Sequence, residues 1–145
     1  MADMEAGLEH LSWAGGTLKH VDLLLIVVDI NAKVQMTARR LVALARQLGI
    51  PSLAMVANRV SSEAQLISIK AFARSLGCEV IGVIPEDENL RASDVEGLCP
   101  LDFAPDSPGV LAIRELAAEL ERRYITDAQL YSNGYEADSS PTASA

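Results

Sequence analysis

The sequence contains few aromatic residues, although much of it is hydrophobic. Phe, Trp and Tyr make up 4% of the 145 residues, whereas hydrophobic residues make up 50%. Leu, Ile, Val and Ala must therefore form the core, and the chain is long enough to build one globular unit. Aliphatic cores of this kind are common where helices cover parallel strands. The composition thus favours an α/β domain.

Cysteines are also scarce, and the sequence has no long hydrophobic run. Cys78 and Cys99 are too far apart for a compact metal-binding knuckle, and two unpaired thiols are typical of a reducing cytoplasm. The most apolar stretch, residues 21–28, is far shorter than the ~20 residues that cross a bilayer. Residues 1–10 lack the basic and apolar parts of a signal peptide. We therefore expect a soluble, cytoplasmic protein.

Positive charge is in the minority. The chain has 12 Lys and Arg residues against 20 Asp and Glu residues, which gives a formal net charge of −8. General binding to nucleic acid or to anionic lipid depends on clustered cations that face phosphates. We expect neither nucleic acid nor a membrane as a partner.

The hydrophobic pattern alternates between short apolar runs and helical periods. An unbroken apolar run at residues 21–29 is typical of a central parallel strand. The other predicted strands are residues 52–57 and 79–84, with a turn at residues 58–61. The predicted helices are residues 35–48, 62–76, about 90–96, and 109–123, and a loop occupies residues 97–108. The small, polar residues 124–145 predict a disordered tail.

Alternation of strands and helices with short connections predicts right-handed βαβ units in a parallel sheet. Ligands of such sheets gather at the carboxyl ends of the strands, which here are residues 29–32, 58–59 and 85–87. A sheet of three strands would leave the apolar run at residues 21–28 along an edge, which natural proteins usually cover. We therefore expect a further strand or a partner to cover this edge.

Four segments resemble, in order and spacing, the second half of the MinD/ParA-type P-loop ATPases. They are residues 3–10 (DMEAGLEH), 21–29 (VDLLLIVVD), 56–60 (VANRV) and 82–87 (GVIPED). The first segment is most similar to the CooC group, the nickel-insertion ATPases of carbon monoxide dehydrogenase maturation. The resemblance implies a Rossmann-like P-loop NTPase fold over residues 1–123, incomplete, with about three strands and flanking helices.

On the phosphate side, the resemblance implies roles for three residues near the start of the chain. Asp3 matches the carboxylate that holds a magnesium-bound water, a role for which one hard oxygen ligand suffices. Ala6 and Gly7 match the switch turn, where a backbone N–H approaches the γ-phosphate. An ordinary turn at a frayed N-terminus is the alternative for all three.

On the base side, Asn58 matches the residue that reads adenine, and its amide can donate and accept at once. Pro85 and Asp87 match the Ile-Pro-x-Asp loop that offers backbone groups to the base, and Arg59 could cover the base plane. The alternative is plain turn chemistry, since Asn is common after strands and Arg59 could be a solvated residue.

The sequence also departs from the family. It contains no Gly-x-x-x-x-Gly-Lys-Ser/Thr loop to cradle phosphates, and it has no Cys-x-Cys pair of the CooC type. We therefore expect weak or no binding of ATP and Mg²⁺ by this chain alone, and no hydrolysis. The resemblance implies the C-terminal part of a CooC-like ATPase for nickel insertion, as a homodimer or with a chain that supplies the N-terminal half, and with a metalloenzyme client. The alternative is a non-catalytic binding or regulatory module that pairs with a chain carrying the P-loop.

Overall fold

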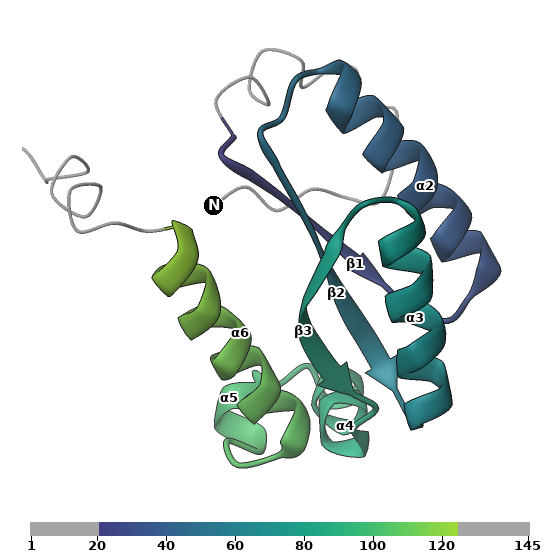
Figure 1. The fold of residues 1–145 in the computed structure, drawn as a ribbon. Helices are drawn as coiled ribbons and strands as arrows, with labels where there is room; N and C mark the ends of the chain where they lie inside the picture. The colour runs from purple at the N-terminus through teal and green to yellow at the C-terminus, as the bar shows by residue number, and fades with distance from the viewer. Residues whose placement is uncertain (1–20, 125–145) are drawn as a thin grey trace, which may run out of the picture.

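The computed structural model describes residues 21–124, which form a parallel sheet with helices on both sides (Figure 1). The sheet has three strands in the order β1-β2-β3, and both neighbouring pairs are parallel. Its elements are β1 Leu23–Val28, α2 Ala32–Gln47, β2 Ser52–Val60, α3 Glu63–Ser75, β3 Glu79–Pro85, α4 Glu88–Glu96, α5 Pro100–Phe103 and α6 Pro108–Tyr124. The predicted fold class is confirmed. The expectations for Asp3, Ala6, Gly7 and the tail after residue 124 lie outside the described residues.

Local sequence fixes where α2 and α3 begin and end. The Asn31 side chain accepts from the N–H of Lys33 at 2.9 Å, and the Ser62 hydroxyl accepts from the N–H of Gln65 at 3.3 Å. These caps satisfy N–H groups that the first turn of a helix leaves without partners. Both helices are followed by a glycine with positive φ, Gly49 at 74° and Gly77 at 63°. Glycine adopts this left-handed conformation without steric cost.

The main core lies between the sheet and the layer of α2 and α3. Met55, in the middle strand β2, is completely buried there. Its neighbours in the cluster are aliphatic residues from two strands and two helices: Ile26, Val28, Ala57, Ala38, Val42, Ile69 and Ala73. As the composition predicts, this core needs no aromatic residue among its fully buried members.

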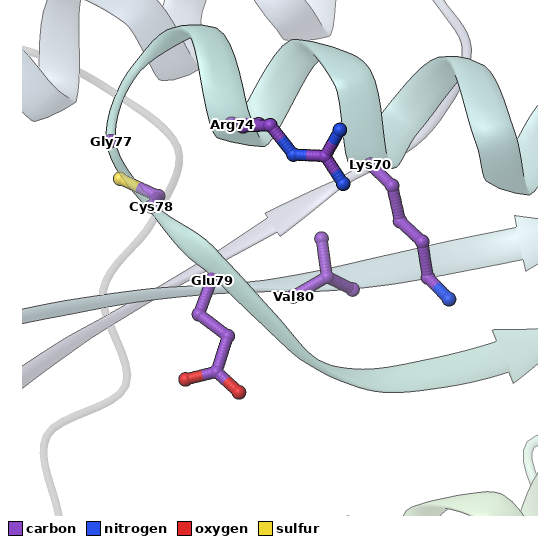
Figure 2. Close-up of a pocket in the computed structure, with 6 residues that line it drawn as sticks. All are labelled: Lys70, Arg74, Gly77, Cys78, Glu79 and Val80. Carbon is purple, nitrogen blue, oxygen red and sulfur yellow. The ribbon is translucent and has the colours of Figure 1, made fainter.

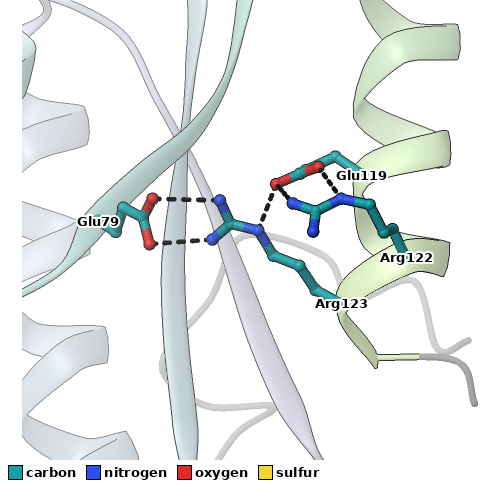
Figure 3. Close-up of polar contacts among 4 residues, drawn as sticks. All are labelled: Glu79, Glu119, Arg122 and Arg123. Carbon is teal, nitrogen blue, oxygen red and sulfur yellow. Dashed lines mark hydrogen bonds and ion pairs between the residues drawn. The ribbon is translucent and has the colours of Figure 1, made fainter.

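Helix α6 packs against β3 from the other side, and a glycine sets the distance. A Cβ atom built on Gly82 would come within 2.8 Å of Leu116 Cδ1, so the bare backbone lets the helix approach closely. At the far end of α6, Arg123 donates to both carboxylate oxygens of Glu79, at 3.0 and 3.3 Å, and also pairs with Glu119 (Figure 3). These contacts join the end of α6 to the start of β3.

Several predicted boundaries are wrong, each for a local reason. Helix α2 begins at Ala32 rather than at residue 35, because the Asn31 cap starts it one turn earlier. The predicted loop 97–108 contains the short helix α5, which has Pro100 at its first position, where a missing N–H costs nothing. In the described sheet β2 is the central strand and β1 lies at an edge, so the prediction of a central strand at residues 21–29 is not met there.

The predicted turn at residues 58–61 is also wrong. Strand β2 continues to Val60, and Val60 pairs with Pro85 of β3. The regular register is interrupted between Ala57 and Val60, and Arg59 has a φ of 54°. The sequence signal of a turn was therefore produced by a β-bulge, which uses the same left-handed backbone as many turns.

Candidate functional site

The carboxyl ends of the three strands meet at one edge of the sheet. Asp29 follows β1, Asn58 and Arg59 lie in the last residues of β2, and Pro85 ends β3. The N–H of Glu86 donates to the carbonyl of Val60 at 3.0 Å, which joins the ends of β2 and β3. The structure thus brings Asn58, Arg59 and Pro85 to neighbouring strand ends. Ligands of parallel α/β sheets bind at such an edge.

Asp29 connects three elements at this edge. Its carboxylate accepts a hydrogen bond from the N–H of Asn31 at 2.7 Å and pairs with the guanidinium of Arg59. Its carbonyl accepts a longer bond, 3.4 Å, from the side chain of Gln35 in α2. Asp29 is 9% exposed. It therefore ties the end of β1 to the start of α2 and to the bulge of β2.

The protonation of Asp29 reflects two opposing effects. Burial raises the pKa of the Asp29 carboxyl, because a charge is less stable away from water. The hydrogen bonds from Arg59 and from the Asn31 N–H, together with the positive charge of Arg59, lower it by more, so the net result is a lowered pKa. Asp29 is therefore an anion at neutral pH.

The bulge at the end of β2 places Asn58 and Arg59 in different surroundings. Arg59 is the one non-glycine residue within 21–124 with a positive φ, a conformation that costs about 1–2 kcal/mol for a residue with a Cβ atom. Its side chain is 66% exposed and reaches Asp29. Asn58 is half-buried beside it. The ion pair with Asp29 thus holds the guanidinium of Arg59 near the end of β1.

Asp87 lies in a capping arrangement at the start of two helices. One carboxylate oxygen accepts from the N–H of Asn89 in α4 at 2.9 Å, and the other accepts from the N–H of Gly109 in α6 at 2.8 Å. The hydrogen bond from the Gly109 N–H lowers the pKa of Asp87 most. Burial raises this pKa, but the further hydrogen bonds from the Ser107 hydroxyl and from Asn89 also lower it, so the net result is a lowered pKa. Asp87 therefore holds the segment after Pro85 against the start of α6.

Two residues at this edge were missed or left without a role by sequence reasoning. Residues 29–32 were placed at the ligand edge, yet Asp29 received no function. The available signal was an acidic residue directly after a buried strand, followed by the cap Asn31. The sequence around Gly109 does not indicate its role, because that role depends on how closely Leu90 and Asp87 approach it in the fold. A Cβ atom built on Gly109 would lie 2.5 Å from Leu90 Cδ1 and 3.0 Å from Asp87 Oδ2.

Two hollows of the described surface lie away from this edge. One, of about 460 Å³, is lined by Lys70, Arg74 and the segment 77–80 at the amino end of β3 (Figure 2). Cys78 lies there, and burial raises the pKa of its thiol, which the charge of Arg46 only partly offsets. The other, of about 430 Å³, lies between β3, α3 and α6. Within residues 21–124 no group of three or more His, Cys, Asp or Glu side chains could hold a metal ion.

Within residues 21–124, no helix is both long enough and apolar enough to cross a membrane. A parallel sheet covered by helices, with polar residues collected at its carboxyl edge, is typical of the α/β domains that bind a ligand at that edge. This is the class that the fold and the edge at Asp29, Asn58 and Pro85 support.

Comparison with known sequences narrows the class. No protein-family model matches the chain. An uncharacterised ATP-binding protein of Methanocaldococcus jannaschii is 39% identical over 95 residues, which are 66% of this chain and 36% of that protein. The carbon monoxide dehydrogenase accessory protein CooC of Rhodospirillum rubrum is 36% identical over 105 residues, which are 72% of this chain and 38% of CooC. The chain therefore spans less than half the length of these relatives.

Solved structures agree on the fold. The cell division protein MinD of Aquifex aeolicus matches with a TM-score of 0.62 and 24% identity, over 75% of this chain and 48% of that one. MinD of Pyrococcus horikoshii, solved with Mg-ADP, matches with a TM-score of 0.59 and 24% identity, over 70% of this chain and 42% of that one. The chain is similar in sequence to CooC and to an ATP-binding protein of Methanocaldococcus jannaschii, and its fold is part of the fold of the MinD/ParA-type ATPases.

Proposed function

We propose that this chain supplies the adenine side of a nucleotide site in a CooC-like ATPase. The observation that carries the proposal is the meeting of Asn58 and Pro85 at adjacent strand ends in a chain that is 36% identical to CooC over 105 residues. An amide beside exposed backbone groups suits the edge of adenine, which both donates and accepts hydrogen bonds. We propose that Arg59, which pairs with Asp29, covers one side of the base.

The phosphate side is not provided by the described residues. Most of the affinity of P-loop proteins comes from the loop that cradles the phosphates, and the sequence contains no such loop. We therefore propose that adenosine and ADP bind the isolated chain weakly and with affinities equal within about twofold, because the base makes the main contacts.

Titration of the full chain followed by amide NMR tests this proposal. Adenosine and ADP should shift the signals of Asn58 and Glu86 at the carboxyl edge. Asn58→Ala should weaken binding by about tenfold, which corresponds to about 1.4 kcal/mol for the lost polar contacts. Gln47→Ala, an exposed amide at the end of α2, is the control and should bind as the wild type does. If the Asn58→Ala variant binds adenosine and ADP as tightly as the wild type does, the adenine site does not lie at this edge.

We propose that the isolated chain does not hydrolyse ATP. In the family the reaction needs a lysine on the β- and γ-phosphates together with the loop that holds them. A phosphate-release assay with Mg²⁺ should give no turnover above buffer. Turnover that depends on Mg²⁺ and disappears in an Asp3→Ala variant would overturn this point.

For the whole protein, we propose ATP-dependent nickel delivery to a metalloenzyme, with a homodimer or a second chain completing the site. The support is the relation to CooC, a carbon monoxide dehydrogenase accessory protein. Mixing the chain with a separately produced P-loop half from a CooC relative, and measuring ATP hydrolysis and nickel transfer, tests both parts. Failure of the mixture to hydrolyse ATP, although the two halves form a complex, would contradict the proposal.

The edge strand β1 favours a second candidate function, a non-catalytic module that pairs with another chain. β1 hydrogen-bonds with β2 alone among the described strands, and Val27 is 53% exposed although it lies in an apolar strand. An open edge of this kind can accept an added strand. An intact mass of the endogenous protein clearly above 15.5 kDa favours a single-chain ATPase. A mass of 15.5 kDa fits both the module and a split ATPase, and the mixing experiment then separates these two: a complex that hydrolyses ATP favours the split ATPase, and a complex without hydrolysis favours the module.

A further inference from the structure

Strand β3 is the second edge of the described sheet, and a hollow runs along it. Among the strands of residues 21–124, β3 pairs with β2 alone. The hollow of about 430 Å³ is lined by four consecutive residues of β3, 80–83, by Lys70 of α3, and by Leu116 and its neighbours in α6. Figure 1 shows α3 and α6 on opposite sides of β3. Because β2 occupies the other side of the strand, a hollow that touches both helices lies along the open edge of β3.

The hollow of about 460 Å³ extends this groove toward the amino end of β3. It shares Lys70 and Val80 with the first hollow and adds Arg74 and residues 77–79. Residues 77–83 span about 20 Å in extended conformation, at about 3.3 Å per residue. We call the two hollows together the edge groove. Its length suits a segment of about six or seven extended residues.

The floor of the edge groove is a strand edge with apolar side chains. One row of backbone N–H and C=O groups of β3 faces β2, and the other row has no strand partner within residues 21–124. Every apolar residue of β3 is only partly buried. The register with β2 shifts between Met55 and Val56, which leaves Ile81 as an extra residue in β3. Such a bulge discourages pairing with a long, flat strand, so this edge suits a short segment.

The two rims of the edge groove differ in charge. Lys70 and Arg74 of α3 line one rim, and Glu115 and Glu119 of α6 line the other. Figure 2 shows Lys70 and Arg74 extending from α3 on the same side of β3. Within residues 21–124, none of Lys70, Arg74 and Glu115 has an ion-pair partner. The α3 rim therefore offers two positive charges to a ligand, whereas Glu115 makes the α6 rim unfavourable for an anion.

We propose that the edge groove binds a short extended peptide of a partner protein, with acidic residues at alternate positions. Lys70 and Arg74 are four residues apart, which separates them by about 6 Å along α3. Side chains two residues apart in an extended peptide face the same side and are separated by about 6.6 Å. Two such acidic residues can therefore meet both cations. The residues between them face the α6 rim, where Ala112 and Leu116 favour apolar side chains. Backbone groups of the peptide pair with the outer row of β3.

A second copy of this chain does not fit the same groove. Two β3 edges related by a twofold axis would pair antiparallel and would place α3 beside α3 and α6 beside α6. Lys70 and Arg74 would then face their own copies, and so would Glu115. Like charges in opposed positions disfavour such an association. The charges of the rims thus favour a partner of different sequence. Neither Asn58 nor Pro85 lines the groove, so the proposal is independent of the nucleotide site.

Amide NMR of the full chain, titrated with the synthetic peptide Thr-Val-Asp-Val-Asp-Val-Thr, tests the proposal. The signals of Ile81, Gly82 and Val83 should shift and should saturate below about 2 mM peptide. The same peptide with Lys in place of both Asp residues should bind at least about tenfold more weakly. Only every second N–H of a strand faces a given edge. N-methylation of one alternate set of peptide residues should therefore abolish binding, and N-methylation of the other set should not.

Lys70→Glu with Arg74→Glu should reverse the preference, so that the Lys peptide binds more tightly than the Asp peptide. Lys33→Glu with Arg40→Glu, at exposed positions of α2, changes the net charge equally outside the groove and should bind as the wild type does. Circular dichroism confirms that each variant is folded.

Three results of these titrations would overturn the proposal: no saturable shift with the Asp peptide, an unchanged preference after reversal of the α3 rim, or an equal loss in the α2 control. Sedimentation velocity provides a fourth. If the chain without peptide forms a dimer that the Asp peptide dissociates, the groove belongs to a second copy and the proposal is wrong.

Discussion

The guanidinium of Arg59, in the bulge of β2, pairs with the carboxylate of Asp29 at the end of β1. The two residues are 30 positions apart in the chain, and α2 lies between them. The pair holds a residue with a φ of 54° in place, beside the proposed adenine contact Asn58. An unfavourable backbone conformation persists where surrounding contacts fix it, and such positions are frequent at functional sites.

Replacing Asp29 should loosen the carboxyl edge. Asp29→Ala removes the acceptor for the Asn31 N–H and the partner of Arg59, so we expect a loss of about 1–2 kcal/mol of unfolding free energy. Because the Arg59 side chain is exposed, solvent screens its ion pair with Asp29, and the lost ion pair accounts for only a small part of this loss. Urea denaturation measures the change. Asp22→Ala, an exposed carboxylate just before β1, is the matched control and should lie within about 0.5 kcal/mol of wild type.

Stability should fall in acid through Asp29 and Asp87. The folded protein lowers the pKa of both carboxyl groups, so the unfolded chain, with an Asp pKa of about 3.9, takes up protons first. The stability contributed by these groups is thus fully present above that value and is lost as the pH falls through their lower folded pKa values. Thermal unfolding between pH 7 and pH 3 should show little change down to about pH 5 and a decline below about pH 4.

The matched variant for the acid effect is Asp29→Asn with Asp87→Asn. It should be less stable than the wild type at pH 7 and should lose less stability on acidification, because the two amides do not titrate. A variant with the same acid slope as the wild type would show that other carboxylates cause the decline.

Adding one methyl group at Gly109 should disturb the junction of α4 and α6. Gly109→Ala places a Cβ atom 2.5 Å from Leu90 Cδ1 and 3.0 Å from Asp87 Oδ2, so we expect a loss of about 1–3 kcal/mol through overpacking. Leu90→Ala removes the first of these clashes. The double variant should therefore lose clearly less than the sum of the single losses, as measured by a double-mutant cycle in urea. Strict additivity would contradict the close contact.

Shortening Met55 should produce the largest loss of stability in this set. Met55 is completely buried between the sheet and the layer of α2 and α3, so Met55→Ala leaves a cavity and should cost about 2–5 kcal/mol. Met36→Ala, in a helix position that is 49% exposed, is the control and should cost less than about 0.5 kcal/mol. Similar losses for both would show that the core does not depend on Met55.

The fold class could be predicted from the sequence because its signals are local. Continuous apolar runs identified the three strands, and glycines after α2 and α3 marked the helix ends, as Gly49 and Gly77 confirm. The order of these elements also implies parallel pairing, because a helix that connects two neighbouring strands returns the chain in the same direction. The roles of Asp3, Ala6, Gly7, Asn58, Arg59, Pro85 and Asp87 in binding stay predictions.

Contacts between distant segments could not be read in this way. The pairing of Asp29 with Arg59 depends on two strands lying side by side, and the bond from Gly109 to Asp87 joins residues 22 positions apart. The bulge at Arg59 looked like a turn, because both use a left-handed residue and only the pairing of Val60 with Pro85 distinguishes them.

The sequence by itself determined the kind and the approximate limits of the three strands and of the longer helices. These follow from side-chain periodicity, caps and glycines, which act over a few residues. The tertiary structure alone decided that β1 is an edge of the described sheet, that Arg59 is held by Asp29, and that Asp87 joins α4 to α6. Those outcomes depend on distances between segments that are far apart along the chain, and packing sets these distances after the local elements have formed.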